Sequence, residues 1–198
     1  MGMNRFPCEQ YATLELNQVA FPKTGMVVSQ TPLGAKFTTD NSVTGAYGVC
    51  ENGMWVVADK AAGVIDAPAA TTDKPIGIVY TTEKEYDIMH YGLKTFGRKV
   101  AGDYPRVGIF GIGDTVTTNC LQYNTDNFAN NAALDTYLKG DLTTAGTAAY
   151  VVVKAGSPIP EIVKSLPQNY AGIYGRVVKY YTVPNGEVGV KYQIVSLG

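Results

Sequence analysis

Charged residues are scarce in this sequence. Asp, Glu, Lys and Arg together make up 17% of the 198 residues, against about 25% in typical soluble domains. The formal net charge is −1, so the chain lacks the basic field that attracts nucleic acid. No apolar run approaches the roughly 20 residues of a membrane-spanning helix, and residues 1–10 lack the apolar centre of a secretory signal. We therefore expect neither a nucleic-acid partner nor a membrane partner.

Residues that carry acid–base and metal chemistry are also rare. The chain has one histidine, His90, which excludes most designs of catalytic triads and histidine metal sites. The three cysteines, Cys8, Cys50 and Cys120, are far apart and never form a CxxC pair, which favours reduced thiols packed in the protein over disulfides or a zinc site. No neighbour in the sequence would lower the pKa of Cys120 and make it a nucleophile. We interpret Cys120 as a core residue and His90 as a surface or packing residue.

Glycine and tyrosine, in contrast, are abundant, with 22 and 14 copies. A surface poor in charge and rich in tyrosine is typical of a surface that a partner covers. A monomer with little charge would have the same composition, so both interpretations stay open here.

Strand patterns extend over most of the chain. Asn-Gly turns between apolar runs predict two hairpins, one at residues 45–59 around Asn52-Gly53 and one at residues 173–196 around Asn185-Gly186. Other alternating or β-branched runs lie at 11–19, 75–82, 104–110 and 148–153. Many short strands separated by turns predict an all-β sandwich or barrel.

Helix signals are few. The best covers residues 126–140, with Asp126 as the expected N-cap and Gly140 as the expected stop. A short helical turn is expected at 161–166, between two prolines. The predicted fold class is mainly β: a β-barrel, β-tulip or sandwich body with long loops and at most one substantial helix.

The expected domain organisation is an extended N-terminal arm at residues 1–10 and a β-rich body at 11–198. Strand periodicity lapses near 86–102, which marks a candidate division of the body into two subdomains. Two long loops, 60–74 and 120–147, are candidates for binding or assembly, because long insertions on a β scaffold usually carry such functions.

The stretch PRVGIFGIGDTVTTN, residues 105–119, has the clearest resemblance to a chemical motif. Its glycines, Gly108, Gly111 and Gly113, follow the order GxxGxG, and the next run, TVTTN, is a poor helix start. A dinucleotide site needs GxGxxG at the start of a helix, and a P-loop needs a following GK[ST]. We therefore interpret Gly113-Asp114 as a corner between strands.

Two further groups were considered as sites. Glu83, Glu85 and Asp87 would share one face of a strand and could converge on a hard cation, although the glycine-turned loops of Ca²⁺ sites are missing, so a solvated face is favoured. Aromatic residues in alternating strands, Trp55 and the Tyr180-Tyr181 pair, fit a core better than a carbohydrate platform. We assign no catalytic, cofactor-binding or metal residues, and we expect no enzyme.

Residues 48–87 and 104–124 resemble head decoration proteins, the auxiliary capsid proteins of tailed phages that infect Gram-positive bacteria. The matching features are a compact β body, the Gly113-Asp114 corner before a Thr-rich strand, and the Pro105-Arg106 pair at the start of a strand. The resemblance is one of general sequence character, without a diagnostic motif, and carries no catalytic residues.

This resemblance implies a structural virion protein without a cofactor. It would bind the major capsid protein on the outer capsid surface after synthesis in the bacterial cytoplasm, and would stabilise the shell as a homo-oligomer, with a homotrimer as the expected state. Two alternatives stay open: a phage tail, neck or fibre protein, and a β module that binds carbohydrate or a cell surface.

Overall fold

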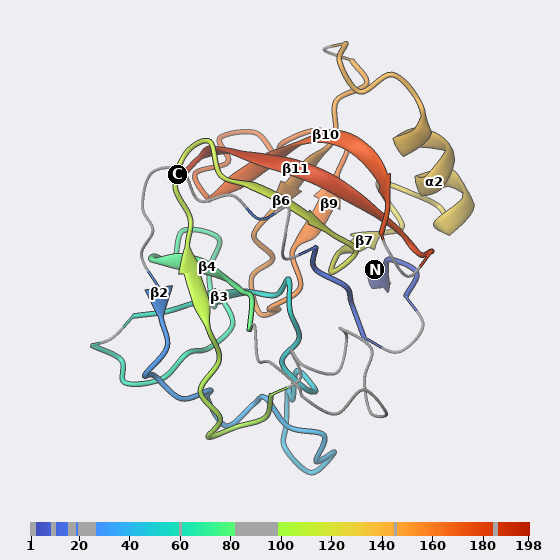
Figure 1. Cartoon of the computed structure of the whole chain (residues 1–198). Coiled ribbons are helices and arrows are strands. Elements are labelled where there is room, and N and C mark those ends of the chain that lie inside the picture. The colour runs from blue at the N-terminus through green and yellow to red at the C-terminus, as the bar shows by residue number, and fades with distance from the viewer. Residues whose placement is uncertain are drawn as a thin grey trace.

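The fold is that of a mainly β protein, as predicted. The structure is a computed structural model. It describes residues 3–8, 11–15, 19, 27–59, 61–81, 99–144, 146–183 and 186–198. The described strands form two sheets, with one α-helix beside the larger sheet (Figure 1).

The larger sheet has seven strands in the order β1-β7-β9-β8-β10-β11-β6. They are β1 (Met3–Arg5), β6 (Thr115–Thr118), β7 (Gln122–Asn124), β8 (Tyr150–Val152), β9 (Glu161–Val163), β10 (Tyr174–Thr182) and β11 (Val188–Ser196). All neighbours are antiparallel except β7 and β9, which are parallel. The long hairpin of β10 and β11 confirms the predicted C-terminal hairpin, although residues 184–185 of its turn lie outside the described residues.

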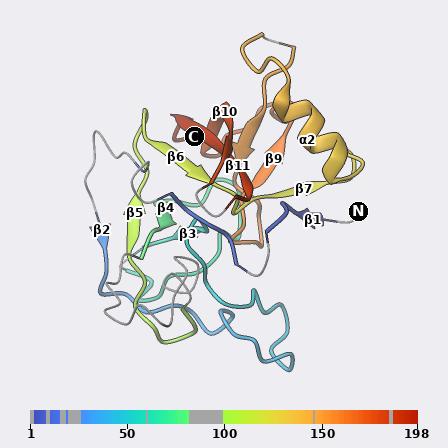
Figure 2. The ribbon, with the colours of Figure 1, turned by 45° about the vertical axis from the view of Figure 1, so that its right-hand side comes forward.

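The smaller sheet is antiparallel, with four strands in the order β2-β5-β4-β3. They are β2 (Val27–Val28), β3 (Trp55–Val57), β4 (Ile76–Val79) and β5 (Val107–Ile109). Within the described strands neither sheet closes into a barrel, because no pairing joins the two outer strands of either sheet. Figure 2 shows the smaller sheet below the larger one, with α2 on the far side of the larger sheet.

The two sheets share a core around one aromatic cluster. The ring of Trp55, on β3, lies 4.9 Å from the ring of Phe110 and 5.9 Å from the ring of Tyr192, on β11, measured between centroids. All three side chains are buried. The sheets are therefore packed against each other by large apolar surfaces, the main source of stability in such folds.

The predicted helix is present but shorter. The helix α2 (Asn131–Lys139) has Asn130 as its N-cap, whose side-chain oxygen accepts a hydrogen bond from the Ala133 N–H at 2.9 Å. The expected N-cap, Asp126, was wrong, because residues 125–127 form a turn that ends before the helix begins. Gly140 ends the helix as predicted, and its N–H donates to the Tyr137 carbonyl.

The expected helical turn at 161–166 was also wrong. Residues Glu161–Val163 form strand β9, which pairs with β8 and with β7. Ile162 and Val163 are β-branched and buried, so a sheet position suits them better than a helix.

The predicted hairpin at residues 45–59 has its turn but lacks its pairing. Gly53 adopts a left-handed φ of 96°, yet β3 pairs with β4, and Cys50 instead forms a bridge to Lys99. The side chain of Asn52 accepts a hydrogen bond from the Thr81 N–H and donates to the Thr81 carbonyl. These contacts attach the turn to Thr81, just after β4, so the turn does not close an isolated hairpin.

Part of the expected N-terminal arm lies on the body. Met3–Arg5 form β1 and pair with β7, and Phe6 is buried in the core. Residues 3–8 are thus docked on the same chain in this structure, while residues 1, 2, 9 and 10 lie outside the described residues. Farther along, the predicted strand at 11–19 is reduced to a bridge between Leu14 and Thr118 in its described part.

The segment between β5 and β6 connects the two sheets. Strands β2 to β5 form the smaller sheet, and β6 to β11 belong with β1 to the larger one. Most of the candidate subdomain division near 86–102 lies outside the described residues. The predicted strands at 75–82, 104–110 and 148–153 are confirmed as β4, β5 and β8, and the expected loop at 120–147 contains β7 as well as α2.

Candidate functional site

The Gly-rich stretch is a corner between sheets, as predicted. Gly113 has a φ of 98°, and the Asp114 Oδ2 accepts a hydrogen bond from the Gly111 N–H at 2.6 Å. The chain continues as strand β6, so no helix N-terminus follows to bind a phosphate. Burial raises the pKa of Asp114, and the hydrogen bond from Gly111 offsets part of that rise.

The thiols of Cys50 and Cys120 lie in the core. Cys50 and Cys120 are fully buried, and burial, followed by the negative charge of Glu51, raises the pKa of each thiol. A protonated, inaccessible thiol is a poor nucleophile. The interpretation of Cys120 as a core residue is confirmed.

His90, Glu83, Glu85 and Asp87 lie outside the described residues, so two interpretations stay predictions: His90 as a surface or packing residue, and the three carboxylates as a solvated face. Within the described ranges, no three His, Cys, Asp or Glu residues are grouped to hold a metal ion. No helix in the same ranges has the length and apolarity of a membrane span.

Of the aromatic candidates, Trp55 is a core residue as predicted, whereas Tyr180 and Tyr181 are half-buried. Trp55 is buried between the sheets. The Tyr180 hydroxyl donates a hydrogen bond to Asp135 of α2, and Lys139 forms an ion pair with the same carboxylate at 2.6 Å. Hydrogen bonds from Lys139, and then from Tyr180, lower the pKa of Asp135. Tyr180 thus fastens the helix to β10.

Sequence reasoning missed a partly buried ion pair between Arg5 and Glu51. The Arg5 Nη1 donates to Glu51 Oε1 at 3.0 Å, the Nη2 contacts Oε2, and the Ala12 N–H donates to Oε2 at 2.7 Å. Glu51 is 5% exposed. The two charged residues are 46 positions apart, so no local pattern could have indicated the contact.

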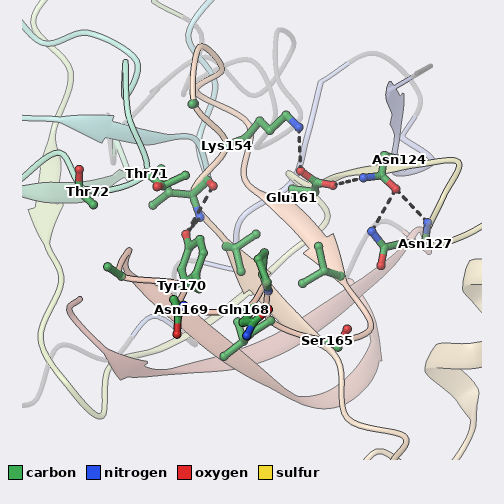
Figure 3. Close-up of a pocket in the computed structure, with 17 residues that line it drawn as sticks. Thr71, Thr72, Asn124, Asn127, Lys154, Glu161, Ser165, Gln168, Asn169 and Tyr170 are labelled. Atoms are coloured by element: carbon green, nitrogen blue, oxygen red, sulfur yellow. Dashed lines mark hydrogen bonds and ion pairs between the residues drawn. The ribbon is translucent and has the colours of Figure 1, made fainter.

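Sequence reasoning also missed a polar pocket at one end of β7, β8 and β9, which we call the Glu161 pocket. Its volume is about 680 Å³, within the range of small-ligand pockets. Figure 3 shows its chain of polar contacts. Glu161 is 6% exposed, and its Oε2 lies 3.0 Å from the Lys154 Nζ while its Oε1 accepts a hydrogen bond from the Asn124 Nδ2 at 2.8 Å. The Asn124 Oδ1 accepts in turn from the backbone and side-chain N–H groups of Asn127.

The opposite part of the Glu161 pocket is formed by residues 165–171. The Tyr170 hydroxyl accepts a hydrogen bond from the Val153 N–H at 3.0 Å and lies 3.2 Å from the Ile173 carbonyl, to which it can donate. Burial raises the pKa of Tyr170 to about 12, so the hydroxyl keeps its proton at neutral pH. Asn169 has a φ of 57°, the single positive value among the described non-glycine residues.

Comparisons with protein-family models, with curated proteins and with solved structures found no match.

Proposed function

We propose that this protein is a structural component of a phage virion, a decoration protein that binds the outer capsid surface and stabilises the shell. The observation that carries the proposal is that three reactive side chains in the described part of the chain, Glu51, Cys50 and Cys120, have structural surroundings. Glu51 is paired with Arg5, and the thiols of Cys50 and Cys120 are buried with raised pKa values. A buried, protonated thiol is inert, and the ion pair joins segments that are far apart in the sequence, as expected of a structural role.

The framework suits a protein that acts through many weak contacts. Two packed sheets hold long irregular segments at the surface; the loop at 34–48, light blue in Figure 1, projects from the end of the molecule that lies away from α2. Summed contacts of several such segments, repeated in a homotrimer, would bind a shell firmly although each contact is weak.

One surface favours this role. The segments around Leu33, Ile65 and Gly102 lie side by side, because Leu33 forms a bridge to Ile65 and its carbonyl accepts a hydrogen bond from the Gly102 N–H at 3.1 Å. Three large side chains of these segments are exposed: Val64 and Val100 by 39% each, and Tyr104 by 60%. Protein interfaces are enriched in tyrosine and depleted of charge at their centre. We propose that this Tyr104 surface contacts the major capsid protein.

The test uses purified heads stripped of the protein. Adding back the wild-type chain should restore both occupancy and the heat stability of the shell, and binding should survive moderate salt, because an apolar and aromatic contact is screened less than exposed ion pairs. Tyr104→Ser should reduce occupancy. Val178→Ser removes a similarly exposed apolar residue (55%) on β10 and is the control.

Two results would overturn the proposal. One is co-purification of the protein with tails, which would favour the tail, neck or fibre alternative. The other is equal heat stability of heads with and without the protein.

A further inference from the structure

We propose that the Glu161 pocket binds a neutral saccharide unit. This inference goes beyond the proposed function, since a capsid contact does not require a ligand pocket. It rests on three properties of the pocket: its charge balance, its mixture of polar and apolar lining, and its rigid rim.

The charge balance favours a neutral ligand over an ionic one. Lys154 and Glu161 are the charged side chains among the described lining residues, and they neutralise each other at 3.0 Å. An anion bound to Lys154 would compete with Glu161 and leave a buried carboxylate without its counter-charge, and a cation bound to Glu161 would displace Lys154. Either change is unfavourable, because the Glu161 side chain is only 8% exposed and needs its counter-charge, although the Lys154 side chain is 36% exposed. A neutral ligand leaves the pair intact.

The lining matches the two kinds of surface on a sugar ring. Asn124, Asn127, Gln168 and Asn169 contribute amide groups, and an amide both donates and accepts hydrogen bonds, as a sugar hydroxyl requires. Val152 and Leu166 line the same pocket and offer apolar surface for the C–H face of a ring. A pocket with apolar walls and a few fixed polar groups is the usual form of a small-ligand site.

The rim is held in place before any ligand binds. The Tyr170 hydroxyl is bonded to the backbone of Val153, and the Tyr170 ring packs edge-on against Tyr174 with centroids 6.2 Å apart. Asn169, beside it, adopts a left-handed φ of 57°, a conformation that asparagine tolerates better than most residues. A rigid rim lowers the entropy cost of binding. Figure 3 shows Gln168, Asn169 and Tyr170 together on one side of the chain from Lys154 to Asn127.

The experiment is an NMR titration of the isolated, full-length protein. The neutral probes are maltotriose, lactose and N,N′-diacetylchitobiose, and the anionic probes are inorganic phosphate and 3′-sialyllactose. We expect at least one neutral probe to shift the side-chain amide signals of Asn124, Asn127, Gln168 and Asn169. The double variant Q168A/N169G, which keeps a residue suited to positive φ, should weaken this binding by about tenfold, the loss expected for one or two hydrogen bonds. Asn41→Ala removes an exposed amide that does not line the pocket and should leave binding unchanged.

The inference would be overturned if no neutral probe shifted the signals of the pocket amides at about 20 mM, a concentration at which even millimolar affinity would be visible. Shifts with the anionic probes alone would also overturn it. So would equal weakening of binding by Asn41→Ala and by Q168A/N169G. Because the titration uses no capsid, its failure would leave the decoration proposal standing, and loss of capsid binding would leave the saccharide site standing.

Discussion

The indole Nε1 of Trp55 donates a hydrogen bond to the hydroxyl oxygen of Tyr192 at 2.9 Å, inside the core between the two sheets. Trp55 belongs to β3 and Tyr192 to β11, 137 residues later. The bond satisfies two polar groups that would otherwise be buried without a partner. Burial raises the pKa of Tyr192, so its hydroxyl remains neutral.

Removing the Tyr192 hydroxyl should destabilise the protein. Tyr192→Phe leaves the Trp55 N–H buried and unpaired, which costs about 1–3 kcal/mol. The measurement is the free energy of unfolding in denaturant. Tyr174→Phe, which changes a half-buried tyrosine of the same sheet, is the control. Equal stabilities of wild type and Tyr192→Phe would show that the bond contributes nothing.

The pair of Arg5 and Glu51 should hold the N-terminal strand on the body. Arg5→Met leaves the buried carboxylate of Glu51 without its counter-charge and should cost up to about 3 kcal/mol, the lower end for a buried pair because a third of the Arg5 side chain is exposed. The double variant Arg5→Met/Glu51→Gln should recover part of this loss. Hydrogen exchange at β1 and β7 would report the local effect; unchanged exchange in Arg5→Met would contradict it.

The turn at Gly53 should tolerate no side chain. An added Cβ would lie 2.5 Å from the Cys120 Cβ, and φ is 96°. Gly63 has a φ of 71° but open space around its Cβ position, so Gly63→Ala should cost only about 1 kcal/mol, from the backbone conformation. Gly53→Ala should cost a further 1–3 kcal/mol or so, from overpacking. Thermal unfolding of both variants measures the difference, and similar midpoints would rule out the crowding.

The N-terminus of α2 can be located by mutation. Asn130→Ala should cost about 1 kcal/mol because it removes the N-cap hydrogen bond. Asp126→Ala, at the exposed position first expected from the sequence, should change stability very little. A larger loss of stability in Asp126→Ala than in Asn130→Ala would instead support a longer helix that begins at Asp126.

Stability should fall at alkaline pH through the buried thiols. The pKa values of Cys50 and Cys120 are raised above the ordinary value of 9.0 in the folded protein, so the folded state binds these protons more tightly than the unfolded state. Their stabilising effect is complete below about pH 9 and is lost above it, by about 1.4 kcal/mol per pH unit for each thiol. Denaturation at about pH 8, 9 and 10 measures this slope. Cys50→Ala should show a shallower slope, and an unchanged slope would contradict the assignment.

The amino-acid sequence by itself determined the features that depend on a few neighbouring residues. Alternating β-branched runs specified β4, β5 and β8, and Gly140 specified the end of α2. The hairpin of β10 and β11 and the corner at Gly113-Asp114 followed from turn residues that adopt conformations few others tolerate. These preferences act over one or two turns of chain and can be seen without the fold.

The tertiary structure alone decided which segments meet. Asn52-Gly53 makes a turn wherever it lies, but its binding to Thr81 depends on a residue 29 positions away, just after β4. Residues 161–163 form a strand because β7 and β8 offer them partners and a buried position. The ion pair of Lys154 and Glu161 lies in a pocket that also needs β7 and residues 165–171. Pairing partners and burial are set by the summed packing of the whole chain, and this non-local free energy overrides local propensity wherever the two compete.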